Sequence, residues 1–119
     1  MSIPVTHEDI DGVQVLTIGS EKFSIDEENL EEISQKLLDQ VVSLPPKVII
    51  DMRHVNFFGS SFIETLFRVW NRIKEANGQF GIANLEEYCR EILKITNLDS
   101  VWTIYSDLDS AVKALSEEA

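Results

Sequence analysis

One stretch, residues 47–74, constrains the fold more than any other part of the chain, because its apolar pattern changes from that of a strand to that of a helix. Residues 48–50 form a β-branched apolar run, which is typical of a strand buried on both faces in an α/β sheet. After Ser60 the apolar residues recur at helical spacing, on a stripe made of Ile63, Leu66, Trp70 and Ile73. The stretch therefore predicts a buried strand, a tight loop and an amphipathic helix.

Strand and helix signals alternate in the rest of the chain as well. Asp11-Gly12 is a turn signal between two alternating segments, which predicts an antiparallel hairpin whose first strand lies at the sheet's edge. We expect strands over residues 3–7, 13–18, 48–50, 80–83 and 101–105. We expect helices over residues 26–42, from Ser60 to the Asn77-Gly78 pair, from Asn84 to Lys94, and after Ser106.

Three of these helices are expected to begin at capping side chains. Ser24 with Glu27, and Asn84 with Glu87, have the spacing of a capping box, and Ser106 precedes the last helix. The element order, β-β-α-β-α-β-α-β-α, predicts an α/β fold with a mixed, mostly parallel sheet of about five strands and about four helices. A chain of 119 residues has the length of one domain, over residues 1–119.

The net charge of −11 argues against several kinds of partner. Nucleic acid phosphates and anionic lipids would repel such a surface, so we expect no direct nucleic-acid binding. No apolar run approaches the roughly 20 residues of a membrane-spanning helix, and the first residues lack a secretory signal. We therefore expect a cytoplasmic protein without membrane insertion. The lone Cys89 excludes an intrachain disulfide and is expected to be a small buried or half-buried apolar group. The isolated His7 and His54 suggest no metal site.

The junction Gly59-Ser60-Ser61, where the loop becomes a helix, is the candidate site. Free N–H groups and the positive end of the helix dipole make it the place where we expect an anion. A purely structural role also fits the residues, because Ser61 and Glu64 have the spacing of a capping box. Asp51, at the end of the buried strand, is expected to position the loop through hydrogen bonds.

Several segments, taken together, resemble the STAS domain, the fold shared by bacterial anti-sigma factor antagonists and the cytoplasmic tails of sulfate transporters. Residues 48–52 (VIIDM) are similar to the family's central strand, and residues 55–63 (VNFFGSSFI) are similar to its hallmark loop. Residues 92–99, 102–105 and 109–112 match its carboxyl-terminal pattern. The resemblance covers nearly the whole chain and implies a STAS-like fold.

The resemblance also implies a function and a site. In the antagonists the loop reads Asp-Ser-Ser/Thr-Gly-Leu, and its first serine is phosphorylated by an anti-sigma factor that is itself a serine kinase. The unphosphorylated antagonist holds that kinase and frees the sigma factor. The matching phosphoacceptor here is Ser60, with Ser61 as the alternate. The implied partner-binding surface also contains Phe58, Gly59, Phe62 and Glu64.

Departures from the family loop keep a second interpretation open. Gly59 stands in place of the aspartate, Phe62 in place of the glycine, and Glu64 where a small or apolar residue is usual. Such a loop also suits an interaction or scaffold module that binds partners, or self-associates as a homodimer, without phosphorylation. An enzyme is disfavoured because the loop lacks the Gly-x-Ser-x-Gly elbow, and no motif implies a nucleotide or another cofactor. We therefore expect a regulatory binding protein.

Overall fold

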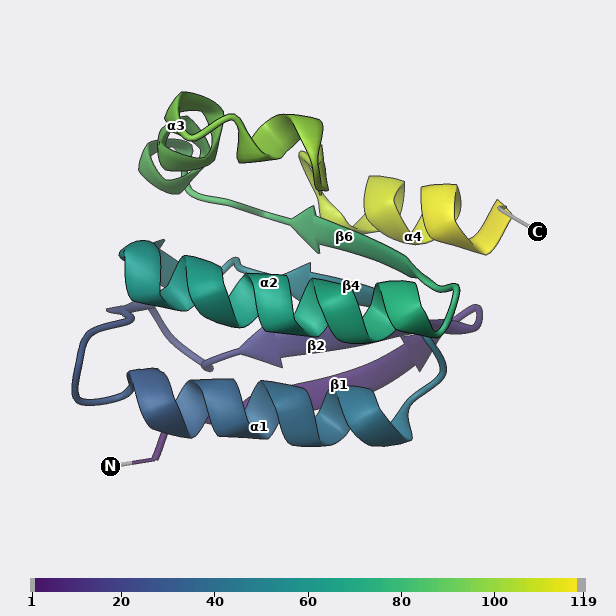
Figure 1. Ribbon diagram of the computed structural model, residues 1–119, viewed down its shortest axis with the longest axis horizontal. Coiled ribbons are helices and arrows are strands. Elements are labelled where there is room, and N and C mark those ends of the chain that lie inside the picture. The colour runs from purple at the N-terminus through teal and green to yellow at the C-terminus, as the bar shows by residue number, and fades with distance from the viewer. Residues whose placement is uncertain (1, 118–119) are drawn as a thin grey trace.

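A sheet of five strands in the order β1-β2-β4-β6-β7 lies at the centre of the computed structural model, which describes residues 2–117 (Figure 1). The strands are β1 (Val5–Ile10), β2 (Val13–Ile18), β4 (Lys47–Asp51), β6 (Gln79–Ala83) and β7 (Thr103–Tyr105). β1 pairs with β2 antiparallel, and the other neighbouring pairs are parallel. The predicted mixed sheet with a hairpin at its edge is confirmed, although β1 and β7 each begin two residues later than predicted.

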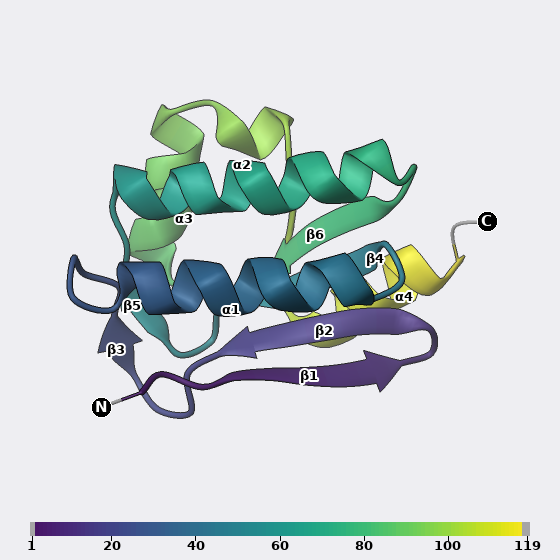
Figure 2. The ribbon, with the colours of Figure 1, turned by 60° about the horizontal axis from the view of Figure 1, so that its bottom comes forward.

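Helices cover both faces of this sheet. α1 (Leu30–Ser43) and α2 (Ser60–Glu75) lie side by side on one face, and α4 (Leu108–Glu117) lies on the other (Figures 1 and 2). α3 (Glu87–Ile95) and a short 3-10 helix, η1 (Leu98–Ser100), form the connection from β6 to β7. The predicted number and order of the α-helices are confirmed.

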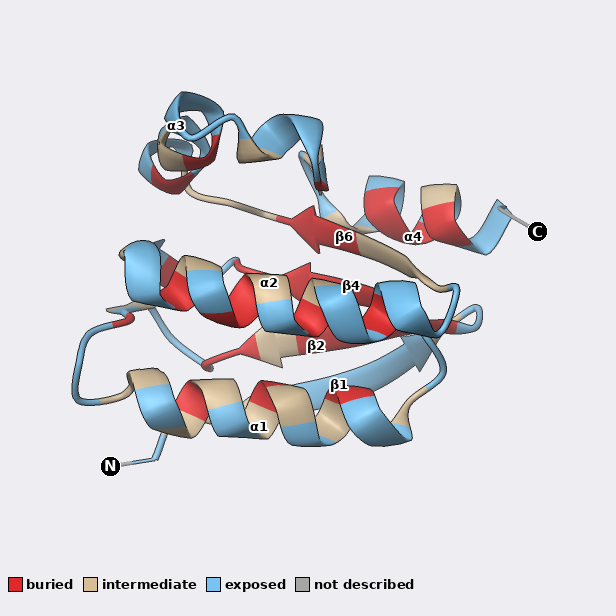
Figure 3. Cartoon of the chain, in the orientation of Figure 1, coloured by how far each residue is buried: buried red, intermediate tan, exposed pale blue. Residues whose placement is uncertain are grey.

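The central strand β4 is buried on both of its faces. Successive strand residues point to opposite sides, so Val48 and Ile50 pack in the cluster beneath α1 and α2, whereas Ile49 packs in the cluster beneath α4. Figure 3 shows buried residues recurring between exposed ones along α1 and α2, as expected for amphipathic helices. Burial on both faces is the reason for the uninterrupted apolar run in the sequence.

A small second sheet is missing from the predicted order. In it, β3 (Phe23–Ser24) pairs parallel with β5 (Val55–Phe57), and the N–H of Ile25 donates to the carbonyl of Phe57 at 2.8 Å. Strands of two and three residues are too short to show an alternating apolar pattern. This sheet ties the segment that leads into α2 to the loop that follows β2 (Figure 2).

α1 begins later than predicted, at Leu30. The preceding residues form a turn, in which the carboxylate of Asp26 accepts two backbone N–H groups at 2.9 and 3.1 Å. The predicted capping box of Ser24 and Glu27 is therefore wrong, because Asp26 takes the local N–H groups before the helix starts.

The other two predicted caps are also wrong. α3 begins at Glu87 without a side-chain cap, and Asn84 has a φ of 61° and donates its amide to Asp51 instead. α4 is capped by Asp107 rather than by Ser106: the Asp107 Oδ1 accepts the backbone N–H three residues further on, at 2.7 Å.

The end of α2 follows the prediction. Asn77 has the left-handed φ of 58°, and the N–H of Gly78 donates to the carbonyl of Ile73 at 2.8 Å. A Cβ atom on Gly78 would lie 1.9 Å from the carbonyl oxygen of Pro46, so only glycine fits this close approach.

Candidate functional site

The candidate site is the turn through which β5 enters α2. Ser60 is the first residue of α2, and Gly59 precedes it in an extended conformation, with φ −107° and ψ −170°. The N–H groups of Phe62 and Ile63 donate to the Gly59 carbonyl at 3.1 and 3.4 Å. The turn lies beyond the carboxyl ends of β2 and β4, which is where proteins with such sheets hold their functional sites (Figure 1).

Ser60 and Ser61 are both exposed, and no side chain caps the helix that they begin. The alternative role of Ser61, as a capping box with Glu64, is wrong, because α2 starts at Ser60 and Ser61 already lies inside the first turn. Neither serine hydroxyl has a hydrogen-bond partner among residues 2–117. The hydroxyls and the positive end of the helix dipole are therefore open to an incoming group.

The structure corrects the expected roles of two aromatic residues at this turn. The side chains of Phe58 and Phe62 are 0% and 1% exposed, and their ring centroids lie 5.3 Å apart in the core. Their rings therefore anchor the turn from below and cannot form a partner-binding surface. Of the predicted surface, Ser60, Ser61 and Glu64 are exposed and Gly59 is half-buried.

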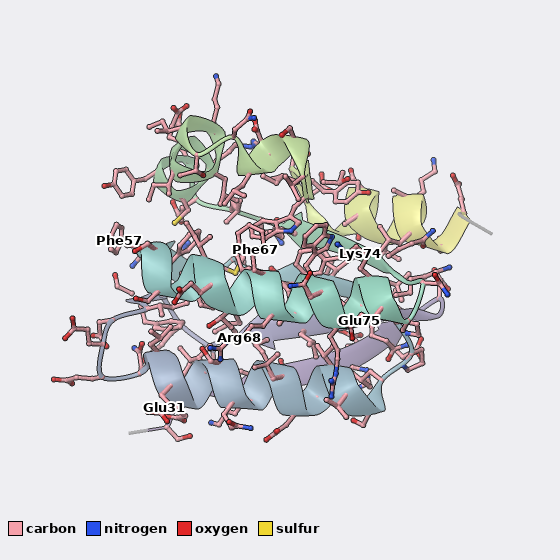
Figure 4. All side chains as sticks on the ribbon, viewed as in Figure 1. Glu31, Phe57, Phe67, Arg68, Lys74 and Glu75 are labelled. Atoms are coloured by element: carbon pink, nitrogen blue, oxygen red, sulfur yellow. The ribbon has the colours of Figure 1, made fainter. Side chains whose placement is uncertain are left out.

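Phe57 is the exposed aromatic residue at this turn. It is 39% exposed, and its ring stacks on that of Tyr88 in α3 with centroids 5.6 Å apart. Figure 4 shows Phe57 beside the first turn of α2. Neighbouring residues of an extended segment point to opposite sides, so the Phe57-Phe58 pair signals one exposed ring without saying which one.

A groove of about 330 Å³ runs beside the two serines. Its lining consists of Ser24, Ile25, Asp26, Glu27 and Leu30 on one side and Phe57, Gly59, Ser60, Ser61 and Phe62 on the other. Asp26 and Glu27 bring carboxylates to the same hollow as Ser60, and the exposed Glu64 follows one turn along α2. A negative charge added to Ser60 would lie among like charges as well as at the positive end of the helix.

Asp51 forms a buried hydrogen-bond network at the carboxyl end of β4. Its side chain is 1% exposed and accepts the backbone N–H of Arg53 at 3.1 Å, the Nε of Arg53 at 2.9 Å and the Nδ2 of Asn84 at 3.0 Å. The expected positioning role of Asp51 is confirmed: these bonds compensate the buried carboxylate and hold the segment leading to β5.

A larger hollow, of about 540 Å³, lies among the loops that follow β2, β4, β6 and β7. Its two cations are already paired, Lys22 with Glu86 and Arg53 with Asp51. All of its other charged lining groups are carboxylates, so this hollow has no unpaired cation to bind an anion.

Cysteine and histidine side chains take structural positions. Cys89 is fully buried, as expected, and burial raises the pKa of its thiol. His7 Nε2 lies 2.6 Å from Oε1 of Gln14 in the edge hairpin.

Within residues 2–117, no three His, Cys, Asp or Glu side chains come together in a way that could hold a metal ion. No helix of the described chain is long and apolar enough to cross a membrane.

Comparison with known proteins gives a family and a relative. The family model described as the STAS domain matches residues 5–111. The chain is 31% identical over 111 residues to the anti-sigma-F factor antagonist RsfB of Mycobacterium tuberculosis, and the match covers 93% of this chain and 88% of that protein.

Two solved structures have the same fold over almost the whole chain. An anti-sigma-factor antagonist (STAS) domain protein from Planctomyces limnophilus is 37% identical with a TM-score of 0.83, covering 98% of this chain and 100% of that one. An anti-sigma factor antagonist from Mycobacterium paratuberculosis is 28% identical with a TM-score of 0.84, covering 98% and 96%. These matches confirm the predicted STAS-like α/β fold.

Proposed function

Because this chain belongs to the STAS domain family, we propose that it is an anti-sigma factor antagonist, which binds an anti-sigma factor with serine kinase activity and is switched by phosphorylation of Ser60. The observation that carries the proposal is the state of Ser60. Ser60 is exposed and is the first residue of α2, and its hydroxyl makes no hydrogen bond that caps the helix. The names of the relatives support the antagonist role, and the loop resemblance supports the choice of serine.

The surroundings of Ser60 explain how a phosphate there would change binding. A phosphate adds roughly −1.5 to −2 charges, and the N-terminal end of α2 offers N–H groups and a positive dipole to hold it. The buried rings of Phe58 and Phe62 fix the turn from below. Phosphorylation would therefore change the charge of the docking surface without refolding the turn.

Three carboxylates favour a second candidate function, a STAS module that binds its partner constitutively. Asp26 and Glu27 share the groove with Ser60, and Glu64 follows one turn along α2. Their repulsion opposes a phosphate at Ser60. In addition, Gly59 supplies no carboxylate where the family loop has its aspartate. Such a module would bind its partner through the same surface without being switched.

Phosphorylation and binding assays separate the two candidates. Each serine-kinase anti-sigma factor encoded in the same genome would be purified and incubated with the chain and ATP, with intact-mass and fragment spectra to locate phosphate. We expect one phosphate on Ser60, none on Ser60→Ala, and one on the matched control Ser61→Ala. In calorimetry, Ser60→Ala should bind like the wild type, while Ser60→Asp should bind about tenfold more weakly because it adds a charge at the docking surface. Binding without phosphate transfer, with equal affinity of both Ser60 variants, would establish the constitutive module.

A further inference from the structure

Two arginines of α2 share a groove with aliphatic side chains of α1. The groove has a volume of about 360 Å³ and is lined by Leu38 and Val42 from α1 and by Arg68, Asn71, Arg72 and Glu75 from α2. Figure 4 shows Arg68 on the side of α2 that faces α1. Val42 is 59% exposed and Leu38 is half-buried, so aliphatic carbon is open to solvent beside the guanidinium groups. This surface is here named the arginine groove.

The arginine groove lies in the second half of α2, away from the turn at Ser60. At a rise of 1.5 Å per residue, Arg68 and Arg72 lie about 12 and 18 Å along the helix from Ser60. The charged lining residues of the groove beside Ser60 are two carboxylates, Asp26 and Glu27. The arginine groove instead has two cations and one carboxylate. The two grooves therefore suit occupants of opposite charge.

Neither arginine is bound within the part of the chain that the structure describes. Among residues 2–117, no carboxylate forms an ion pair with Arg68 or Arg72, and no acceptor forms a hydrogen bond with them. Glu64 and Glu75 lie one turn from the two arginines on the same helix and are also unpaired there. Like charges at positions i and i+4 repel, so the two arginines do not stabilise α2 as a pair. The helix dipole accounts for Arg72 in the last turn but not for Arg68, which lies before that turn.

Helix α1 adds no charge to the lining of the arginine groove. Its Glu32 and Lys36 pair with each other and with the backbone of the segment before β1. Its exposed Asp39 accepts a hydrogen bond from the amide of Gln35 at 2.8 Å. The charge at the groove is therefore that of its α2 residues, which is positive.

Arg90 and Lys94 form a similar pair of exposed cations on α3, with the same spacing. They line a hollow of about 490 Å³ together with Glu91, Asp99, Thr103 and Ile104. Two carboxylates balance the two cations in that hollow, and its one aliphatic residue, Ile104, is half-buried. Excess positive charge and open aliphatic surface thus coincide in the arginine groove and not at the pair on α3.

We infer that the arginine groove binds an acidic amphipathic helix of a second protein. The helices α1 and α2 lie side by side, and a third helix can lie in the groove between them (Figure 2). Arg68 and Arg72 are one helical turn apart, so the occupant needs two carboxylates three or four residues apart to pair with both. An apolar side chain on the same face of that helix would cover Leu38 and Val42.

A second copy of this chain does not present such a helix. The acidic first turns of α1 keep their apolar residues, Leu30 and Ile33, packed in their own core. The exposed carboxylates of α3 alternate with Arg90 and Lys94, which would meet the arginines of the groove. Charges more than about 8 Å apart are largely screened at physiological salt, so an acidic occupant meets the two guanidinium groups rather than the net charge of −11.

The inference does not depend on the proposed function, because the arginine groove and Ser60 are far enough apart to be occupied together. A displayed library of random peptides about 15 residues long, roughly four helical turns, would be selected on the immobilised full chain. We expect an enriched class of peptides that carry Asp or Glu three or four residues apart, with an apolar residue on the same helical face.

Fluorescence anisotropy at about 0.15 M salt then gives the affinity of a synthetic peptide from this class. Arg68→Glu combined with Arg72→Glu should weaken binding at least about tenfold. Arg90→Glu combined with Lys94→Glu is the matched control, because it adds the same charge to another helix, and it should change the affinity less than about twofold. All four side chains are exposed, so both double variants should keep the thermal midpoint of the wild type.

Three outcomes would overturn the inference. The first is a selection without an acidic class of peptides. The second is an acidic peptide that binds the Arg68→Glu, Arg72→Glu variant as tightly as the wild type. The third is a wild-type dimer in sedimentation that this variant dissociates, which would make a second copy the occupant. None of these results bears on kinase binding at Ser60, which the assays of the proposed function measure separately.

Discussion

Glu32 joins two parts of the chain that are far apart in sequence. Its Oε2 accepts the N–H of Ile3 at 3.0 Å, the hydroxyl of Ser2 at 2.5 Å and the ammonium of Lys36 at 2.7 Å. These bonds, chiefly that from Lys36, lower the pKa of the Glu32 carboxyl to about 2. One carboxylate of α1 thus fastens the segment that precedes the edge strand β1.

The lowered pKa of Glu32 predicts a specific dependence of stability on pH. A carboxyl whose pKa is lower in the folded state stabilises the fold above its ordinary pKa near 4.5, and this contribution is lost as pH falls from 4.5 to about 2. Glu32→Gln should therefore lose less stability than the wild type over that interval, as measured by urea unfolding at a series of pH values. Glu31→Gln is the control, since Glu31 accepts no hydrogen bond from the described residues and should leave the wild-type curve unchanged. Parallel curves for Glu32→Gln and the wild type would contradict the role of Glu32.

Prediction at the residue level succeeded where a residue's position follows from a clear pattern. Asp51 was located because the apolar run of a buried strand ends there, and Ser60 because the apolar spacing changes to that of a helix after it. The role of Ser60 as phosphoacceptor stays a prediction. Phe57 and Phe58 show the limit: alternation requires them to point apart, but the choice between them is made by the pairing of β5 with β3. That pairing joins segments some thirty residues apart, through strands too short to show a pattern.

At the scale of elements, the long strands and helices followed from their apolar periodicity, whereas helix starts did not. A cap depends on a boundary known to within one residue, and neighbouring Ser, Asp and Asn side chains compete for the same N–H groups. At the start of α4 the competitors are adjacent, and Asp107 accepts the N–H bond at 2.7 Å that the sequence interpretation assigned to Ser106. The hydrogen bonds from Ser110 also lower the pKa of the Asp107 carboxyl.

Capping variants check this assignment directly. Asp107→Ala should lower the thermal midpoint by a few degrees, because it leaves a first-turn N–H without its acceptor, and Asp107→Ser should restore most of the loss. Ser106→Ala should change the midpoint little. Ser61→Ala should also change it little, because no side chain caps α2. A larger loss for Ser106→Ala than for Asp107→Ala, measured by thermal denaturation, would reverse the assignment.

At the scale of the whole molecule, the sheet separates two unequal cores. The larger core lies beneath α1 and α2 and extends to Trp102, which contacts the rings of Phe67 and Phe80. The smaller core lies beneath α4 and contains Val13, Val15, Ile49, Ala83, Ala111, Val112 and Leu115. The site at Ser60 is built on the larger core, because the buried rings of Phe58 and Phe62 belong to it. α4 is consequently the helix that can loosen without disturbing the site.

Leu66 and Leu115 allow this division to be tested with the same substitution on opposite faces of the sheet. They are 1% and 2% exposed, and replacing a buried leucine with alanine costs about 2–5 kcal/mol. Leu66→Ala should lower the global free energy of unfolding by that amount and speed hydrogen exchange throughout the chain. Leu115→Ala should speed exchange most in α4, because that helix can open while the backbone hydrogen bonds between the strands stay formed. Binding at the Ser60 surface should then survive Leu115→Ala. Equal acceleration of exchange in α1, α2 and α4 by Leu115→Ala would show instead that the two cores unfold as one unit.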